Sequence, residues 1–118
     1  MRFVTKQIHA LLDYPVAIAL MALPFILGLG SSNPLALQLS VATGIAAFIL
    51  TLLTNHHLGA LKVIPYRIHL LVDGLVAVVF LLAPIVFSFK GIDAYYYWIN
   101  GIAVLTVVSL HKPETAVI

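Results

Sequence analysis

Two histidines and two aspartates stand in the same spacing at two places in the chain. His9 is followed four positions later by Asp13, and His69 is followed four positions later by Asp73. Residues four apart share one face of an α-helix and lie about 6 Å apart along its axis, so each pair can interact locally. Two imidazoles and two carboxylates also suit a divalent zinc, iron or manganese ion. The spacing therefore predicts either two separate polar pairs or one shared metal site.

Further chemistry remains open for the histidines. His56, His57 and His111 could add ligands or orient the ligating groups by hydrogen bonds. His9 and His69 could instead be axial ligands of a haem, although no haem motif supports this. The His and Asp side chains could also relay protons, since histidine titrates near neutral pH.

No residue is assigned a catalytic role. The chain contains no Gly-x-Ser-x-Gly, no His-Glu-x-x-His and no phosphate-binding glycine loop. These absences argue against an enzyme without excluding one.

The two polar pairs belong to an internal repeat. Residues 7–13 and 67–73 each open a long apolar run, and the copies match sixty positions apart. The matched residues are Ile8 and Ile68, His9 and His69, Leu11 and Leu71, Asp13 and Asp73, Val16 and Val76, Ala17 and Ala77, and Pro24 and Pro84. Later in each copy, Gly44 aligns with Gly101, so the repeating unit is a whole helical hairpin.

The composition is that of a membrane protein. Of 118 residues, 63% are hydrophobic and only 8% are charged, whereas roughly a quarter of a soluble domain is charged. There is no cysteine, which excludes disulfides and thiolate metal sites. The few basic residues stand at the ends of apolar runs, where they set membrane topology, so no nucleic-acid partner is expected. The length fits one domain, residues 1–118.

Four apolar runs are long enough to cross a hydrocarbon core of about 30 Å. They cover residues 8–29, 35–54, 68–89 and 95–111. The turns within each repeat are short, which predicts antiparallel helical hairpins. We therefore expect an all-α fold, a membrane four-helix bundle built from two parallel two-helix hairpin repeats, at about 7–55 and 67–112. A pseudo-twofold axis along the membrane normal would bring the two His-Asp pairs together if they face inward.

The basic residues predict which side of the membrane each end occupies. With four crossings, both termini and the central loop share one side. That side holds Arg2, Lys6, Lys62, Arg67 and Lys112, against Lys90 on the other. The excess of Lys and Arg predicts that both termini are cytoplasmic. All five histidines then fall on the cytoplasmic side as well.

Short motifs in each hairpin have a familiar order. The second copy contains Asp73-Gly74, Ala83-Pro84-Ile85 and Trp98-Ile99-Asn100-Gly101, and the first contains Asp13 and Leu23-Pro24-Phe25. Over nearly the whole chain this order resembles the SPW-repeat membrane proteins, although only the Pro of Ser-Pro-Trp is kept in both copies. The resemblance implies a small bacterial integral membrane protein, expected in the cytoplasmic (inner) membrane. It implies no established activity.

The sequence favours a structural or partner-binding membrane module. The short outer loops leave little surface for soluble ligands, so the expected partner is another membrane protein or a second copy. The alternative is a metal-binding or haem-binding protein whose site, His9, Asp13, His69 and Asp73, lies at the cytoplasmic mouth of the bundle. The direction of these four side chains distinguishes the two hypotheses.

Overall fold

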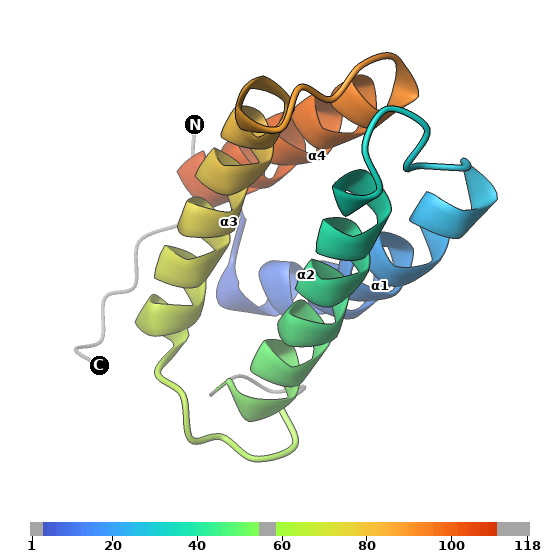
Figure 1. Cartoon of the computed structure of the whole chain (residues 1–118). Coiled ribbons are helices and arrows are strands. Elements are labelled where there is room, and N and C mark those ends of the chain that lie inside the picture. Colours follow the sequence, from blue (N-terminus) through green and yellow to red (C-terminus); the bar gives the residue numbers. More distant parts are fainter. Residues whose placement is uncertain (1–3, 55–58, 111–118) are drawn as a thin grey trace.

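The fold consists of two helical hairpins standing side by side. The structure is a computed structural model that describes residues 4–54 and 59–110, without the side chain of Lys6. The helices are α1 (Lys6–Ile26), α2 (Leu35–Leu53), α3 (Tyr66–Val86) and α4 (Ile92–Ser109). α1 packs on α2 and α3 packs on α4 (Figure 1). The predicted all-α bundle of two hairpins is confirmed.

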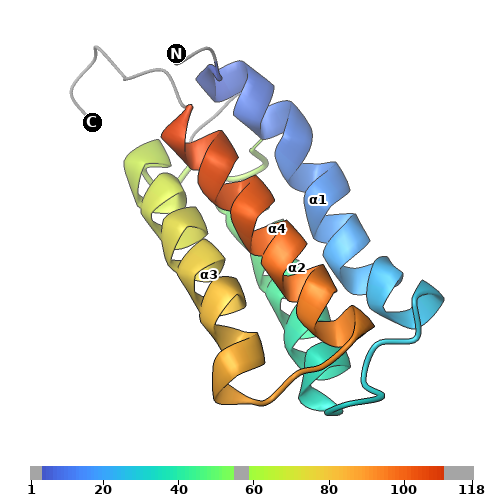
Figure 2. The same cartoon turned by 90° about the horizontal axis from the view of Figure 1, so that it is seen from above.

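The bundle has two distinct ends. Figure 2 shows that α1 and α3 begin at the same end, which we call the start end. The turns at 27–34 and 87–91 lie at the opposite end, which we call the turn end. The two hairpins therefore run in parallel, as the repeat predicts.

α1 and α3 each end three residues before the end of the apolar run that predicted them. The last residues of each run form a turn instead. In these turns the amide of Leu29 donates to the carbonyl of Pro24 (2.9 Å), and the amide of Phe89 donates to that of Pro84 (3.0 Å). Gly28 has a φ of 68°, which ends the helix. Leu29 and Phe89 thereby turn back into the core, where both are buried.

Hydrogen bonds at the start end repeat across the two hairpins. The amide of Ile64, ahead of α3, donates to the carbonyl of Leu53 at the end of α2 (2.8 Å). The amide of Val4, ahead of α1, donates to the carbonyl of Leu110 at the end of α4 (3.1 Å). These residues correspond through the repeat, since Val4 aligns with Ile64 and Leu53 with Leu110. The internal repeat is therefore a pseudo-twofold symmetry of the structure.

Glycines allow the helices within each hairpin to approach closely. A Cβ added at Gly44 in α2 would lie 2.8 Å from the carbonyl oxygen of Ala17 in α1. A Cβ added at Gly101 in α4 would lie 3.1 Å from the carbonyl oxygen of Ala77 in α3. Both contacts occur at matched positions, as is usual where helices pack through small residues in lipid.

The main apolar core lies toward the turn end and joins the two hairpins. Its buried members are Leu20, Leu29, Ala36, Phe80, Ala83, Phe89, Ala94, Tyr96 and Tyr97. Two hydroxyls tie α4 to α2 there: that of Tyr97 donates to the carbonyl of Ala36 (2.6 Å), and that of Tyr96 bonds the hydroxyl of Ser40 (2.7 Å). The hairpins are thus packed firmly against each other at this end.

A buried carboxylate adds a second connection at the turn end. Asp93, in the first turn of α4, is fully buried. It accepts hydrogen bonds from the amide of Gly30 (2.9 Å) and from the amide and hydroxyl of Ser32 (3.0 and 2.5 Å). We call this group the Asp93 clasp. It fixes the α1–α2 turn to the start of α4.

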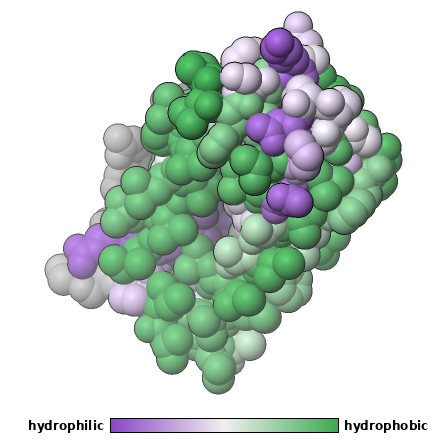
Figure 3. Space-filling model, viewed as in Figure 1, coloured by the Kyte–Doolittle hydropathy of each residue, from purple (hydrophilic) through white to green (hydrophobic). Residues whose placement is uncertain are grey.

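Three helices of the described chain are long and apolar enough to cross a membrane. They are α1 over Gln7–Ile26, α2 and α3. Apolar residues cover most of the face in Figure 3, whereas polar residues gather toward the turn end and in a smaller group at the start end. Large side chains such as Ile26, Ile85 and Ile99 are exposed along the helices, as lipid contact requires. The crossing of α4, the shortest helix, stays a prediction.

Candidate metal centre

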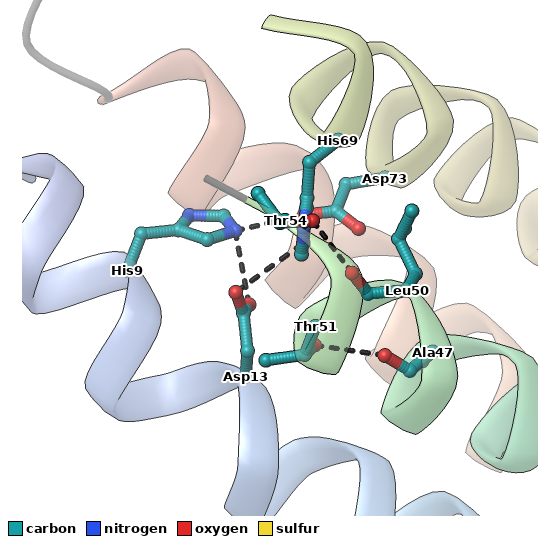
Figure 4. A network of polar contacts seen from close by, with 8 residues as sticks. All are labelled: His9, Asp13, Ala47, Leu50, Thr51, Thr54, His69 and Asp73. Carbon is teal, nitrogen blue, oxygen red and sulfur yellow. Dashed lines mark hydrogen bonds and ion pairs between the residues drawn. The ribbon is translucent and has the colours of Figure 1, made fainter. Parts of the chain in front are cut away.

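The four predicted polar side chains meet between the hairpins near the start end. His9 and Asp13 project from α1 toward His69 and Asp73 of α3 (Figure 4). One ligand atom from each residue can be chosen so that all four lie within 4.8 Å of one another. We call this group the His/Asp ring. The two faces point inward, which is the condition under which the pseudo-twofold axis brings the pairs together.

The His/Asp ring is closed by four contacts. Nε2 of His9 lies 3.0 Å from Oδ1 of Asp13 and 2.8 Å from Oδ2 of Asp73. Nε2 of His69 lies 3.2 Å from Oδ2 of Asp13 and 3.3 Å from Oδ2 of Asp73. Each imidazole therefore contacts both carboxylates. The shortest contact joins the two repeats, which local pairing along one helix does not explain.

The start of each helix places its ring members. The side chain of Thr5 accepts a hydrogen bond from the amide of Ile8 (3.1 Å), which caps α1 so that His9 and Asp13 fall on its first turns. Pro65 precedes α3 in an extended conformation, suited to a helix start. Equivalent helix starts thus present the two His-x-x-x-Asp faces to each other.

Burial differs between the two residue types. The side chains of His9 and His69 are only 4% and 2% exposed, whereas those of Asp13 and Asp73 are 12% and 19% exposed. The imidazoles are therefore held within the bundle, and the carboxylates lie nearer its opening. A buried ring with two partly accessible members leaves a route by which an ion could enter.

A hydrogen-bond chain at the end of α2 places a proton on Nδ1 of His69. The hydroxyl of Thr54 donates to the carbonyl of Leu50 (2.6 Å). The same hydroxyl lies 2.6 Å from Nδ1 of His69. Because a hydroxyl has one proton and that proton is committed to Leu50, Nδ1 of His69 must be the donor to Thr54.

This tautomer gives Nε2 of His69 a specific role. In a neutral imidazole with its proton on Nδ1, Nε2 carries a lone pair. In the neutral imidazole that lone pair would face two carboxylate oxygens at 3.2 and 3.3 Å, whereas a proton on Nε2 would be donated to them. Among the described residues, none donates a hydrogen bond to the buried Oδ2 of Asp13. Electron pairs converging in this way repel each other unless a proton or a metal cation lies between them.

The spacing of the ligand atoms fits such a cation. In a tetrahedral site with nitrogen and oxygen ligands about 2.1 Å from zinc, ligand atoms lie about 3.4 Å apart. The four ring contacts measure 2.8 to 3.3 Å. One ligand atom from each residue lies within 4.8 Å of the others, so side-chain movements would gather the four around one ion. The chain from Nδ1 to a backbone carbonyl through Thr54 is also the kind of support that orients a metal-ligating histidine.

An aromatic side chain borders the ring. Tyr66, at the start of α3, is 1% exposed. Its ring stacks near that of His69 (centroids 6.1 Å apart) and stands edge-on to that of His9 (6.0 Å). Tyr66 therefore shields both imidazoles and limits their rotation.

The geometry favours an ion over a haem. The imidazole rings of His9 and His69 are nearly perpendicular, with centroids 5.6 Å apart. Both Nε2 atoms have carboxylate oxygens within 3.3 Å. A porphyrin between the imidazoles would have to displace both carboxylates.

Two residues at the site, Thr54 and Tyr66, are not among those that the sequence predicts. Thr54 could have been found from the repeat, since it aligns with His111 just after the matched Leu53 and Leu110. The proposed supporting residues His56, His57 and His111 lie outside the described residues.

No protein-family model, curated protein or solved structure matches the chain. The resemblance to SPW-repeat proteins therefore stays a prediction. The function has to be argued from the site.

Proposed function

We propose that this is an integral membrane protein that binds a divalent transition-metal ion through His9, Asp13, His69 and Asp73. The observation that carries the proposal is the His/Asp ring, in which each imidazole Nε2 lies within 3.3 Å of both carboxylates. Nitrogen and carboxylate donors suit zinc, iron or manganese. Two carboxylates also balance the charge of a divalent ion, which a buried site needs.

The structural role favoured by the sequence is less well supported by this geometry. Satisfying two polar pairs at helix starts requires only the local contacts within α1 and α3. The ring adds two contacts between the repeats, and one of them is the shortest of the four. Bundle interiors, where facing helices each contribute ligands, commonly hold metal ions.

The proposed setting follows the sequence expectations. We place the protein in a bacterial cytoplasmic membrane as a member of the SPW-repeat group, with both termini cytoplasmic. Lys62 and Arg67 are exposed at the start end, near the ring, whereas Lys90 is exposed at the turn end. The metal would then be reached from the cytoplasmic mouth of the bundle.

Metal analysis of the purified protein tests the proposal. Protein in detergent, offered Zn²⁺, Mn²⁺ or Fe²⁺ and then desalted, is expected to retain one ion per chain by elemental analysis. His69→Ala should bind the ion at least about a hundredfold more weakly, because one of four ligands is lost from a low-dielectric site. Asp13→Asn should weaken it similarly, and the exposed Gln38→Ala should not.

Circular dichroism separates loss of metal from loss of fold. Helical protein that retains no metal under any of these conditions would contradict the proposal. The His/Asp ring would then be held together by protons, with one imidazole charged between the carboxylates. Metal affinity is compared only for variants that keep their helical content. His69→Ala and Asp13→Asn are both made so that one can be measured if the other unfolds.

A further inference from the structure

A cavity opens from the His/Asp ring into the space between the hairpins. Its volume is about 560 Å³, within the range of roughly 300 to 1,000 Å³ typical of ligand pockets. All four helices line it, and all four ring residues stand in its wall. The cavity and the candidate metal centre are therefore one continuous space.

The wall of the cavity is polar at the ring and mostly apolar elsewhere. Along α1 the lining runs from His9 to Leu20 through Leu12, Asp13 and Val16. From Asp13 to Leu20 this covers about 10 Å of helix. Farther from the ring, Thr43 and Asn100 line the wall from equivalent positions of α2 and α4. The space suits a molecule with one polar head and an apolar body.

The cavity exists because the hairpins touch mainly at other places. They meet in the apolar core and the Asp93 clasp toward the turn end, and in the His/Asp ring near the start end. Between these regions the small residues Ala46, Ala47 and Ala103 stand in the wall. The lining is mostly apolar and partly open to the surroundings of the bundle, so the bilayer is a ready source of an apolar occupant.

Charge selects the head group of that occupant. With a divalent ion bound, Asp13 and Asp73 bring the site to neutrality. An anionic head would add an uncompensated charge to a buried, low-dielectric site, which is costly. A hydrocarbon without a head would place only carbon against the polar ring residues in the wall. An uncharged oxygen donor satisfies both requirements.

We propose that the cavity binds an uncharged, lipid-soluble molecule of medium length with an oxygen head, such as a fatty alcohol, whose oxygen ligates the metal. This inference rests on the proposed metal-binding function. The oxygen would occupy an added coordination position beside His9, Asp13, His69 and Asp73. The apolar body would extend along α1 toward Leu20.

Cobalt substitution tests the inference, because Co²⁺ absorption bands respond to the number and geometry of the ligands. Full-length protein in lipid nanodiscs is loaded with Co²⁺ and titrated separately with decanol, decane and decanoate. Decanol is expected to change the bands in a saturable way. Decane should leave them unchanged, and decanoate should need at least roughly tenfold more ligand than decanol to reach half-saturation.

A cavity-filling variant supplies the matched comparison. Ala47→Leu places a larger side chain in the cavity without replacing a ring residue and should raise the decanol half-saturation at least about tenfold. Ala42→Leu lies on the same helix but is exposed outside the cavity lining, and should behave as wild type. Ala103→Leu provides a second filled cavity if Ala47→Leu fails to fold. Retained Co²⁺ binding shows that the site of each variant is intact.

The outcomes separate the two proposals. If Co²⁺ binds but decanol leaves the bands unchanged, or Ala47→Leu responds as wild type does, the amphiphile proposal is overturned and metal binding stands. A response to decanoate at lower concentration than to decanol overturns the uncharged head. Absence of Co²⁺ binding in folded protein overturns metal binding, and the proposed ligation with it.

Discussion

Thr54 illustrates how one hydroxyl determines the chemistry of a neighbouring side chain. It directs its proton to the carbonyl of Leu50 and accepts from Nδ1 of His69, so Nε2 of that imidazole faces the ring. Without Thr54, His69 could turn its other tautomer to the carboxylates and donate to one of them. The Thr54 hydroxyl therefore controls which nitrogen of His69 faces the carboxylates.

We predict that Thr54→Val weakens metal binding by about ten- to a hundredfold, the usual effect of removing a group that orients a ligand. Valine keeps the shape of threonine but cannot accept the Nδ1 proton. Competition with a chelator measures the affinity. Thr54→Ser retains the hydroxyl and should restore most of it. Equal affinities for the valine and serine variants would show that the hydroxyl does not orient His69.

At the scale of the helices, the close approach of α1 and α2 depends on Gly44. A Cβ there would lie 2.7 Å from the Cγ of Met21, and within 3.0 Å of two backbone atoms of α1. Backbone cannot move aside as a flexible side chain can. At Gly101 the nearest atoms belong to the Leu81 side chain at 2.9 Å, which is easier to displace. The two glycines thus occupy equivalent positions, but a larger residue is tolerated less well at Gly44 than at Gly101.

We expect Gly44→Ala to destabilise the protein by about 2 kcal/mol, because the added methyl group presses on backbone atoms that cannot move aside. Gly101→Ala should destabilise it by less, because the nearest atoms there belong to a side chain that can move. Gly74→Ala is the matched control. A Cβ at Gly74 meets nothing within 4 Å, so the better helix propensity of alanine should leave stability unchanged or raised. Denaturant titration in detergent, followed by circular dichroism, measures all three. Equal effects at Gly44 and Gly74 would contradict the packing argument.

The Asp93 clasp fixes the α1–α2 turn of the first hairpin to the start of α4 in the second hairpin. The carboxylate accepts three hydrogen bonds while fully buried. Its place near the start of α4 is also favourable for a negative charge. The clasp has no counterpart of its type in the first repeat, where the aligned residue is Ala36.

Asp93→Asn should destabilise the protein by about 2 kcal/mol, because hydrogen bonds to a buried charged acceptor are lost. The new amide would also point N–H groups at donors of Gly30 or Ser32. The exposed Ser31→Ala, in the same turn, should have little effect. The measurement is the same denaturant titration. Metal affinity should change little in Asp93→Asn, since the clasp lies at the far end from the ring.

At the scale of the whole molecule, the hairpins are joined at both ends and separated between them. The core and the Asp93 clasp join them toward the turn end, and the His/Asp ring joins them near the start end. The cavity lies between these connections. A metal ion in the ring would therefore stabilise the association of the two repeats as well as supply a ligand position.

The proposed topology predicts opposite labelling of the two ends. The chain has no cysteine, so single cysteines can be introduced at the exposed Lys62 and Lys90. In intact cells a membrane-impermeant maleimide should label Lys90→Cys, whereas Lys62→Cys should react only after permeabilisation. The reverse pattern would place the His/Asp ring on the outer side. Labelling of both in intact cells would contradict an even number of crossings.

The sequence by itself determined the elements and their grouping. Hydrophobic runs of about twenty residues and short turns specify helical hairpins, because backbone groups in lipid must be satisfied within each helix. The repeat of His9-Asp13 at His69-Asp73 specified equivalent faces. It did not reveal that both apolar runs end in turns at Leu29 and Phe89, since such a turn is as apolar as a helix.

Only the tertiary structure decided how those faces are used. Both the local and the shared arrangements of the His-Asp pairs satisfy the same spacing, and the distances between α1 and α3 distinguish them. Thr54 joins the site from just beyond the end of α2, fifteen positions before His69. The cavity arises from where the hairpins fail to touch. Contacts between elements depend on packing across the whole bundle, which no local pattern in the chain encodes.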